Sequence, residues 1–138
     1  MCCPAPASRA ARIVSLCLAL CLSSLLPATA GEFPFDRELL LDAYPMKGSK
    51  QIPSLGVTRS GRASIVLWCN SVQAQVVLAG DTITILTGPL TERQCPSERM
   101  RADDDLLAAL LQVSSWRSEG EALVLRGART MRFRPSTH

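Results

Sequence analysis

Alternating apolar and polar residues predict strands over the middle of this chain. Residues 63–68 form a β-branched and aromatic run that is typical of a buried strand. Residues 72–78 and 82–85 flank the turn Ala79-Gly80-Asp81, and each begins with apolar and polar residues in alternation. This arrangement predicts a hairpin.

The C-terminal part repeats this pattern. Residues 116–118 and 122–125 lie on either side of Glu119-Gly120, which predicts a second hairpin. Residues 130–134 alternate again and stop at Pro135, so they predict a last strand.

The stretch from residue 31 to residue 61 gives weaker signals because its apolar residues are interrupted by Pro34, Pro45, Gly48, Pro53 and Gly56. Residues 38–42 predict a short strand or turn. The rest predicts an irregular connection, with an exposed loop from Pro45 to Pro53.

Between Arg101 and Ser115 the apolar period changes to that of a helix. Asp103-Asp104-Asp105 precede the apolar positions, where carboxylates favour a helix N-terminus. Strands, one amphipathic helix and further strands predict an antiparallel α+β domain. The side chains expected to face the sheet are Leu106, Leu107, Leu110 and Leu111.

Residues 1–30 are typical of a secretory signal peptide. Arg9 and Arg12 precede an apolar run from Ile13 to Leu26, and Ala28 and Ala30 occupy the small-residue positions of a cleavage site before Gly31. The run is shorter than a membrane-spanning helix, which needs about 20 apolar residues. We therefore predict a periplasmic protein whose domain covers residues 31–138.

A lipoprotein is the alternative reading of this leader. Cys17 and Cys21 lie inside the apolar run, but Leu16 and Leu20 precede them where a lipidation site needs a small residue. The residues favour export without lipidation and without a stable membrane span after cleavage.

Charge and composition exclude one class of partner. The net charge of +3 falls to +1 once Arg9 and Arg12 are removed with the leader, and aromatic residues make up only 4% of the chain. Nucleic-acid binding needs a basic footprint or stacking side chains, so we expect none.

Cys69 and Cys95 are the two cysteines that remain after cleavage. An oxidising compartment allows them a single intramolecular pairing, which predicts a disulfide. Two cysteines and one histidine cannot supply the four ligands of a structural zinc site. We therefore expect no metal and no cofactor.

No group of residues predicts catalysis. The single histidine, His138, is the terminal residue, so a Ser-His or Cys-His nucleophile has no credible base. The three consecutive aspartates lack the spacing of a calcium loop. We predict a protein that is not an enzyme and has no catalytic residues.

Four arginines gather near the C-terminus. We interpret them as the solvated face of an edge strand, where charge blocks aggregation, although they could bind an acidic glycan or partner. Trp68 and Trp116 lie in or beside apolar runs and are interpreted as core residues. The arginines are Arg126, Arg129, Arg132 and Arg134.

The order of motifs resembles the META/HslJ domain family. The resemblance rests on Trp68-Cys69-Asn70, the following hairpin, Thr91-x-x-x-Cys95, the helix and the closing strands, over about residues 55–134. It implies a curved antiparallel sheet packed on a helix, and a non-enzymatic envelope protein associated with heat shock or antibiotic tolerance. It brings no catalytic residues.

Two matching positions, Asn70 and Thr91, are candidate site residues. The Asn70 side chain could contact a ligand, but we favour a bond to nearby backbone where the strand leaves the disulfide.

Two functions follow from these observations. The first is a stress-associated envelope protein that acts through its folded surface. The alternative is a periplasmic binding module, such as an inhibitor of a lysozyme-type hydrolase, which would present the loop from Pro45 to Pro53.

Overall fold

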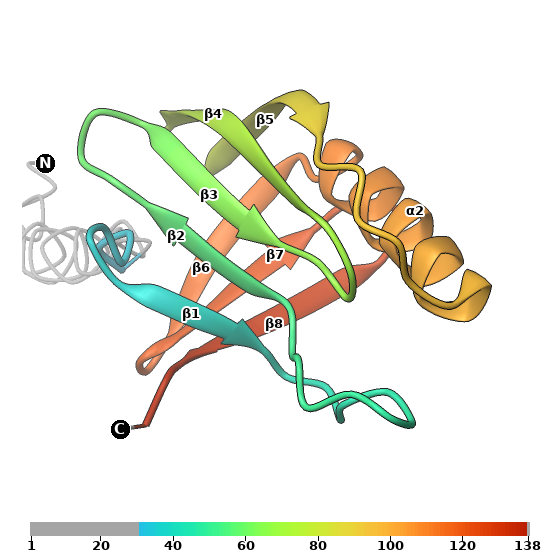
Figure 1. Ribbon diagram of the computed structural model, residues 1–138. Coiled ribbons are helices and arrows are strands. Elements are labelled where there is room, and N and C mark those ends of the chain that lie inside the picture. Colours follow the sequence, from blue (N-terminus) through green and yellow to red (C-terminus); the bar gives the residue numbers. More distant parts are fainter. Residues whose placement is uncertain (1–30, 138) are drawn as a thin grey trace, which may run out of the picture.

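The computed structural model describes residues 31–137, so the predicted leader and His138 lie outside the described residues. Eight antiparallel strands pair in chain order and close into a barrel, because the first strand also pairs with the last (Figure 1). The strands are β1 (Glu38–Leu41), β2 (Ser54–Val57), β3 (Arg62–Val66), β4 (Ser71–Ala79), β5 (Thr82–Leu90), β6 (Ser115–Glu119), β7 (Ala122–Arg126) and β8 (Thr130–Pro135).

One helix, α2 (Ser97–Leu111), connects β5 to β6 and packs beside β5. This confirms the predicted fold class, a curved antiparallel sheet packed on one helix in a single α+β domain. β5 and β6 share only the register pair Thr82 and Ser115, so the barrel is weakly joined at this seam. Within residues 31–137, no helix is both long and apolar enough to cross a membrane.

Both predicted hairpins are confirmed. β4 and β5 pair through a turn in which Gly80 has a φ of +61°, and β6 and β7 pair through a turn in which Gly120 has a φ of +62°. Glycine adopts this left-handed backbone without the steric cost of a Cβ. The predicted last strand is β8.

The N-terminal stretch holds more strand than the sequence predicts. β1 falls where a short strand or turn was expected, but β2 lies in the stretch expected to be irregular. β2 is only four residues long and includes Gly56, so it carries little periodicity of its own. Its pairing with β1 and β3 determines its conformation.

The helix begins and ends four residues earlier than predicted. It starts at Ser97, directly after Pro96, and ends at Leu111. The Asp103–Asp105 segment therefore lies in the helix interior, and the prediction that it marks the helix N-terminus is wrong. Leu106 and Leu110 are buried as expected, whereas Leu111 is 49% exposed and does not face the sheet.

The inward-facing residues of the strands and the helix form one core. Trp116 is buried there, and its indole N–H donates to the Gly80 carbonyl oxygen at 2.9 Å. Its ring packs edge-on against the ring of Phe33, with 5.0 Å between the ring centroids. Trp68 is partly buried against the same core.

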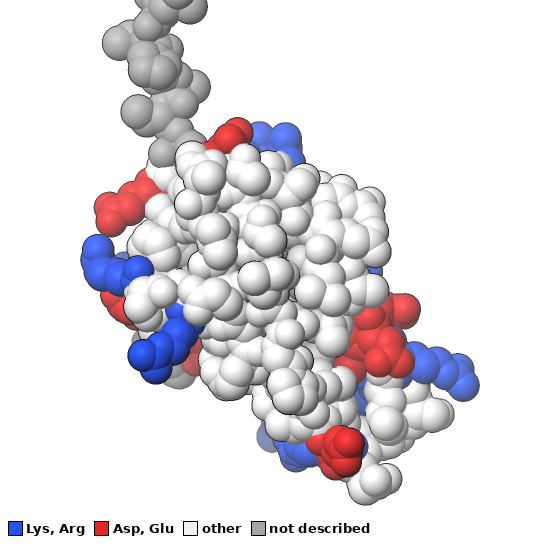
Figure 2. Space-filling model, turned by 90° about the horizontal axis from the view of Figure 1, so that it is seen from above, with Lys and Arg blue, Asp and Glu red and all other residues white. Residues whose placement is uncertain are grey.

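The outer face of the barrel is uneven in charge. Asp81 is the only charged residue between residues 63 and 91, which include β4 and β5. Figure 2 accordingly shows a largely uncharged face from above, with charged side chains toward its rim.

Candidate functional site

The motif residues singled out in the sequence meet at one end of the barrel. Cys69 and Asn70 lie in the turn between β3 and β4, and Thr91 and Cys95 follow β5. The Cys69–Cys95 disulfide is present, with 6.2 Å between the two Cα atoms. The predicted disulfide is thus confirmed, and it joins the β3–β4 turn to the segment that leads into α2.

The Asn70 side chain hydrogen-bonds to the segment that follows β5. Its side-chain oxygen accepts the backbone N–H of Arg93 at 2.7 Å and the Thr91 hydroxyl at 3.0 Å. The Thr91 oxygen in turn accepts the backbone N–H of Ser71 at 3.0 Å. Asn70 is 4% exposed, so these bonds hold the end of β5 against the start of β4 in a nearly dry environment.

Asp103 completes the cluster from the middle of α2. Its carboxylate is 1% exposed and accepts the backbone N–H groups of Cys69 at 2.9 Å and Asn70 at 2.8 Å. It also accepts the side-chain amide of Asn70 at 3.2 Å. Five residues therefore form what we call the Asp103 network: Cys69, Asn70, Thr91, Arg93 and Asp103.

The sequence interpretation of the aspartates needs correction on this point. Asp104 and Asp105 are exposed, as surface residues of a helix would be, but Asp103 is a buried anchor. A buried carboxylate is costly unless it is hydrogen-bonded, and the three donors satisfy that requirement. The polar groups of the network therefore bind one another and the backbone.

No arrangement typical of a metal centre is found in residues 31–137, where no three His, Cys, Asp or Glu residues are grouped for that purpose. Cys69 and Cys95, the two cysteines within the described residues, are both engaged in the disulfide.

Arg132 and Arg134 lie on the outward side of β8, and both form ion pairs. Arg132 and Arg117 pair with Glu119, and Arg134 pairs with Asp42 at 2.7 Å. The hydrogen bond from Arg132, helped by the charges of Arg117 and Arg132, lowers the pKa of Glu119 below its ordinary value.

The prediction that these arginines lie on an edge strand is also wrong. β8 pairs with both β1 and β7, so its arginines do not protect a free edge. Arg126 and Arg129 remain exposed near the β7–β8 turn.

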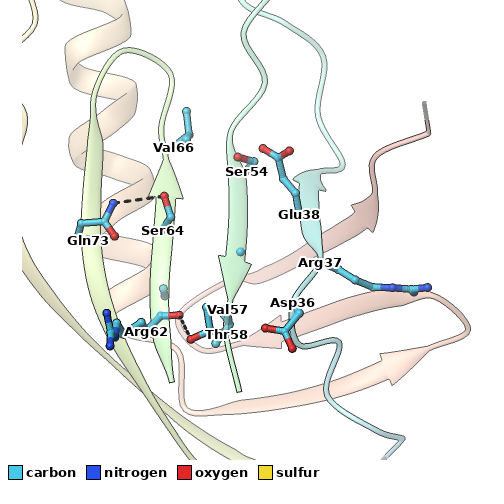
Figure 3. Close-up of a pocket in the computed structure, with 12 residues that line it drawn as sticks. Asp36, Arg37, Glu38, Ser54, Val57, Thr58, Arg62, Ser64, Val66 and Gln73 are labelled. Carbon is cyan, nitrogen blue, oxygen red and sulfur yellow. Dashed lines mark hydrogen bonds between the residues drawn. The ribbon is translucent and has the colours of Figure 1, made fainter. Parts of the chain in front are cut away.

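A groove of about 480 Å³ opens on the outer face of the barrel along β2 (Figure 3), and we call it the β2 groove. The strand register places Glu38 of β1, Gly56 of β2, Ser64 of β3 and Gln73 of β4 in one row across the sheet. Gly56 contributes no side chain to the row, and this gap forms the hollow.

The polar lining of the β2 groove has free hydrogen-bonding capacity. Ser54 is 5% exposed, and its hydroxyl has no partner among the described residues. Glu38 forms no ion pair within residues 31–137, and Figure 3 shows Arg37 pointing away from it. Ser64 accepts the Gln73 amide at 3.5 Å, a long hydrogen bond.

Sequence reasoning missed this groove because no motif marks it. Its lining comes from short runs on β1, β2, β3 and β4 that only the pairing of the strands brings together, and β2 was not predicted. The one signal available is Gly56 between Leu55 and Val57, since glycine inside a strand marks a place that other groups can approach closely.

Comparison with known proteins identifies the family. The META domain model matches residues 38–137, so the chain belongs to the META domain family. A sequence comparison with curated proteins gave no significant match.

Solved structures share the fold. A protein from Burkholderia xenovorans, determined by NMR, is 17% identical with a TM-score of 0.60, and the match covers 81% of this chain and 97% of that one. A DUF4847 family protein from Bacteroides vulgatus is 11% identical with a TM-score of 0.50, over 62% of this chain and 60% of that one. At these identities the likeness concerns the fold alone.

Proposed function

We propose that this META domain protein is exported to the periplasm and acts there, without catalysis, through its folded surface in the response to stress or antibiotics. The observation that carries the proposal is the Cys69–Cys95 disulfide, in a chain whose first 30 residues have the composition of a leader. Disulfides persist in oxidising compartments such as the periplasm.

The Asp103 network supports a structural role for the motif residues. Asn70 and Asp103 are both buried, and their polar atoms are taken up by backbone groups and by each other. A catalytic site instead needs polar groups that converge on a space where substrate can bind. The motif is therefore suited to hold the turn, the disulfide and the helix together.

Export and oxidation can be tested in one experiment. The full chain, expressed in a Gram-negative host, should appear in the periplasmic fraction, begin at Gly31 and contain no free thiol after unfolding without reductant. The matched control carries Arg9→Glu and Arg12→Glu, which remove the positive start of the leader and should retain the protein in the cytoplasm. A lipid-modified Cys17 or Cys21, or two free thiols in exported protein, would contradict the proposal.

The stress role needs a test in cells. A strain that lacks the protein should survive heat or antibiotic challenge less well, and wild-type protein should restore survival. A Cys69→Ala/Cys95→Ala protein should restore it less well at high temperature, where lower stability reduces the folded population. Unchanged survival of the deletion strain under both challenges would count against this role.

The loop between β1 and β2 favours the inhibitor as a second candidate function. Tyr44 is 93% exposed, and both lysines of the chain, Lys47 and Lys50, follow within six residues. Figure 1 shows this connection projecting beyond the barrel. Lysozyme-type hydrolases carry two carboxylates in the active site, which a cationic loop complements in charge.

The inhibitor candidate has a direct assay. Purified protein in molar excess should slow a lysozyme-type enzyme, and Tyr44→Ala with Lys47→Glu should remove the effect. Arg129→Glu makes the same charge change at an exposed residue on another turn and should leave inhibition intact. Absence of inhibition by the wild-type protein would eliminate this candidate.

A further inference from the structure

The β2 groove has the size and the polar groups of a ligand site. Its volume of about 480 Å³ lies within the usual range of small-molecule sites. No fully buried side-chain polar atom in the described residues lacks a hydrogen-bond partner. The unpartnered Ser54 hydroxyl therefore reaches the groove, although Ser54 itself is 95% covered.

The row of side chains across the groove defines what could bind. A carboxylate, Glu38, lies on one side of the gap at Gly56, and a hydroxyl, Ser64, lies on the other. Two strand spacings separate them, which is about 10 Å. This width accommodates a single saturated ring with a hydrogen bond on each side.

The charge of Glu38 selects among ring compounds at its end of the groove, because Figure 3 shows the charged lining side chains Asp36 and Arg62 nearer the opposite end. An ionised carboxylate accepts hydrogen bonds and repels anions, and this one has no cationic partner in residues 31–137. A bound ammonium group would supply that partner. Ser54 and Ser64 each donate and accept, which suits the hydroxyl groups of a sugar.

We propose that the β2 groove binds an amino sugar, with its ammonium group on Glu38 and its hydroxyl groups on Ser54 and Ser64. The carbonyl oxygen of Gln73 extends the same row and accepts a further hydroxyl. Val66, which lies on the same outward side of β3 as Ser64, supplies an aliphatic contact for the ring. This site goes beyond the proposed function, and none of its lining residues belongs to the loop that carries Tyr44.

The test is a titration of ¹⁵N-labelled residues 31–138 with glucosamine, followed by NMR chemical shifts at constant ionic strength. Shifts should saturate and concentrate at the amides of Glu38, Gly56 and Ser64. N-acetylglucosamine keeps the ring and loses the charge, so it should bind at least about tenfold more weakly. Equal affinity for the two sugars, shifts elsewhere on the barrel, or no saturable shifts would overturn the proposal.

Two variants separate charge from shape. Glu38→Gln should weaken glucosamine binding about tenfold and leave N-acetylglucosamine unchanged. Glu121→Gln, at an exposed carboxylate in the β6–β7 turn, is the matched control and should bind as wild type. Wild-type affinity in Glu38→Gln would show that Glu38 does not receive the amine.

Gly56→Val fills the hollow. An added Cβ at Gly56 meets only the Arg37 carbonyl oxygen, at 3.7 Å, which is an ordinary contact. The variant should fold, as its dispersed amide spectrum will show, and should bind neither sugar. If it does not fold, Ser54→Ala provides the same test by removing a hydroxyl without adding bulk, and should weaken both sugars.

These measurements use purified protein alone. A failure to bind sugar would contradict the proposed site and would not affect the proposals of export and of a stress role. A failure of export would contradict the proposed function and would not affect the proposed sugar site.

Discussion

The carboxylate of Asp103 accepts hydrogen bonds from both the backbone N–H and the side-chain amide of Asn70, which lies 33 residues earlier in the chain. This pair joins the middle of α2 to the β3–β4 turn. The disulfide joins the same turn to the segment just before α2. A covalent and a polar connection thus hold one end of the barrel.

Asp103→Ala should lower the free energy of unfolding by about 2–5 kcal/mol, because it leaves buried N–H groups without an acceptor. Asp104→Ala changes the adjacent exposed aspartate and should cost less than about 0.5 kcal/mol. Urea unfolding of both variants measures the difference. Equal midpoints would contradict the anchoring role of Asp103.

Leu110→Ala should cost about 2–5 kcal/mol, as truncation of a buried leucine does elsewhere. Leu110 is 1% exposed, whereas the next residue, Leu111, is 49% exposed. Leu111→Ala should therefore lie within about 0.5 kcal/mol of wild type. Thermal unfolding monitored by circular dichroism compares the two, and a tolerant Leu110→Ala would show that α2 packs by another face.

Removal of the disulfide should destabilise the protein without changing its fold. Cys69 and Cys95 are 26 residues apart, and a loop of that length gives about 3.5 kcal/mol on the chain-entropy model. The Cys69→Ala/Cys95→Ala variant should show this loss in urea unfolding. Wild-type protein in reductant should behave like the variant, and a stability unaffected by reductant would contradict the prediction.

The lowered pKa of Glu119 predicts that the stability of the fold depends on pH. Its pKa is lowered in the folded state, first by the hydrogen bond from Arg132 and then by nearby positive charge. A carboxylate of lowered pKa stabilises the fold above its unfolded-state pKa, and the contribution is lost as the pH falls through its folded-state pKa. NMR titration of the Glu119 carboxyl carbon should show the lowered pKa, and Arg132→Gln should raise it toward the ordinary value. An unchanged pKa in Arg132→Gln would contradict the stated cause.

Local periodicity accounts for the elements that could be predicted from the sequence. In both hairpins apolar and polar residues alternate over several positions, and the turns contain Gly80 and Gly120. Each hairpin can therefore be predicted from its own residues. The disulfide could also be predicted, since only two cysteines follow residue 30. These signals do not depend on the rest of the fold.

The elements that could not be predicted depend on distant residues. β2 is a strand because β1 and β3 pair with it. Asp103 looks like its exposed neighbours in the sequence, and only its position opposite Asn70 makes it a buried anchor. The β2 groove arises from the alignment of four strands, which no single segment encodes.

The pairing of β1 with β8 has a consequence for the order of folding. Every other strand pair forms between neighbours in the chain, but this pair joins its two ends. A partly synthesised chain can therefore build the hairpins early, yet β1 has no partner on one side until β8 has been made. The free edge of β1 is therefore covered only when β8 pairs with it. Formation of a single hairpin does not cover that edge.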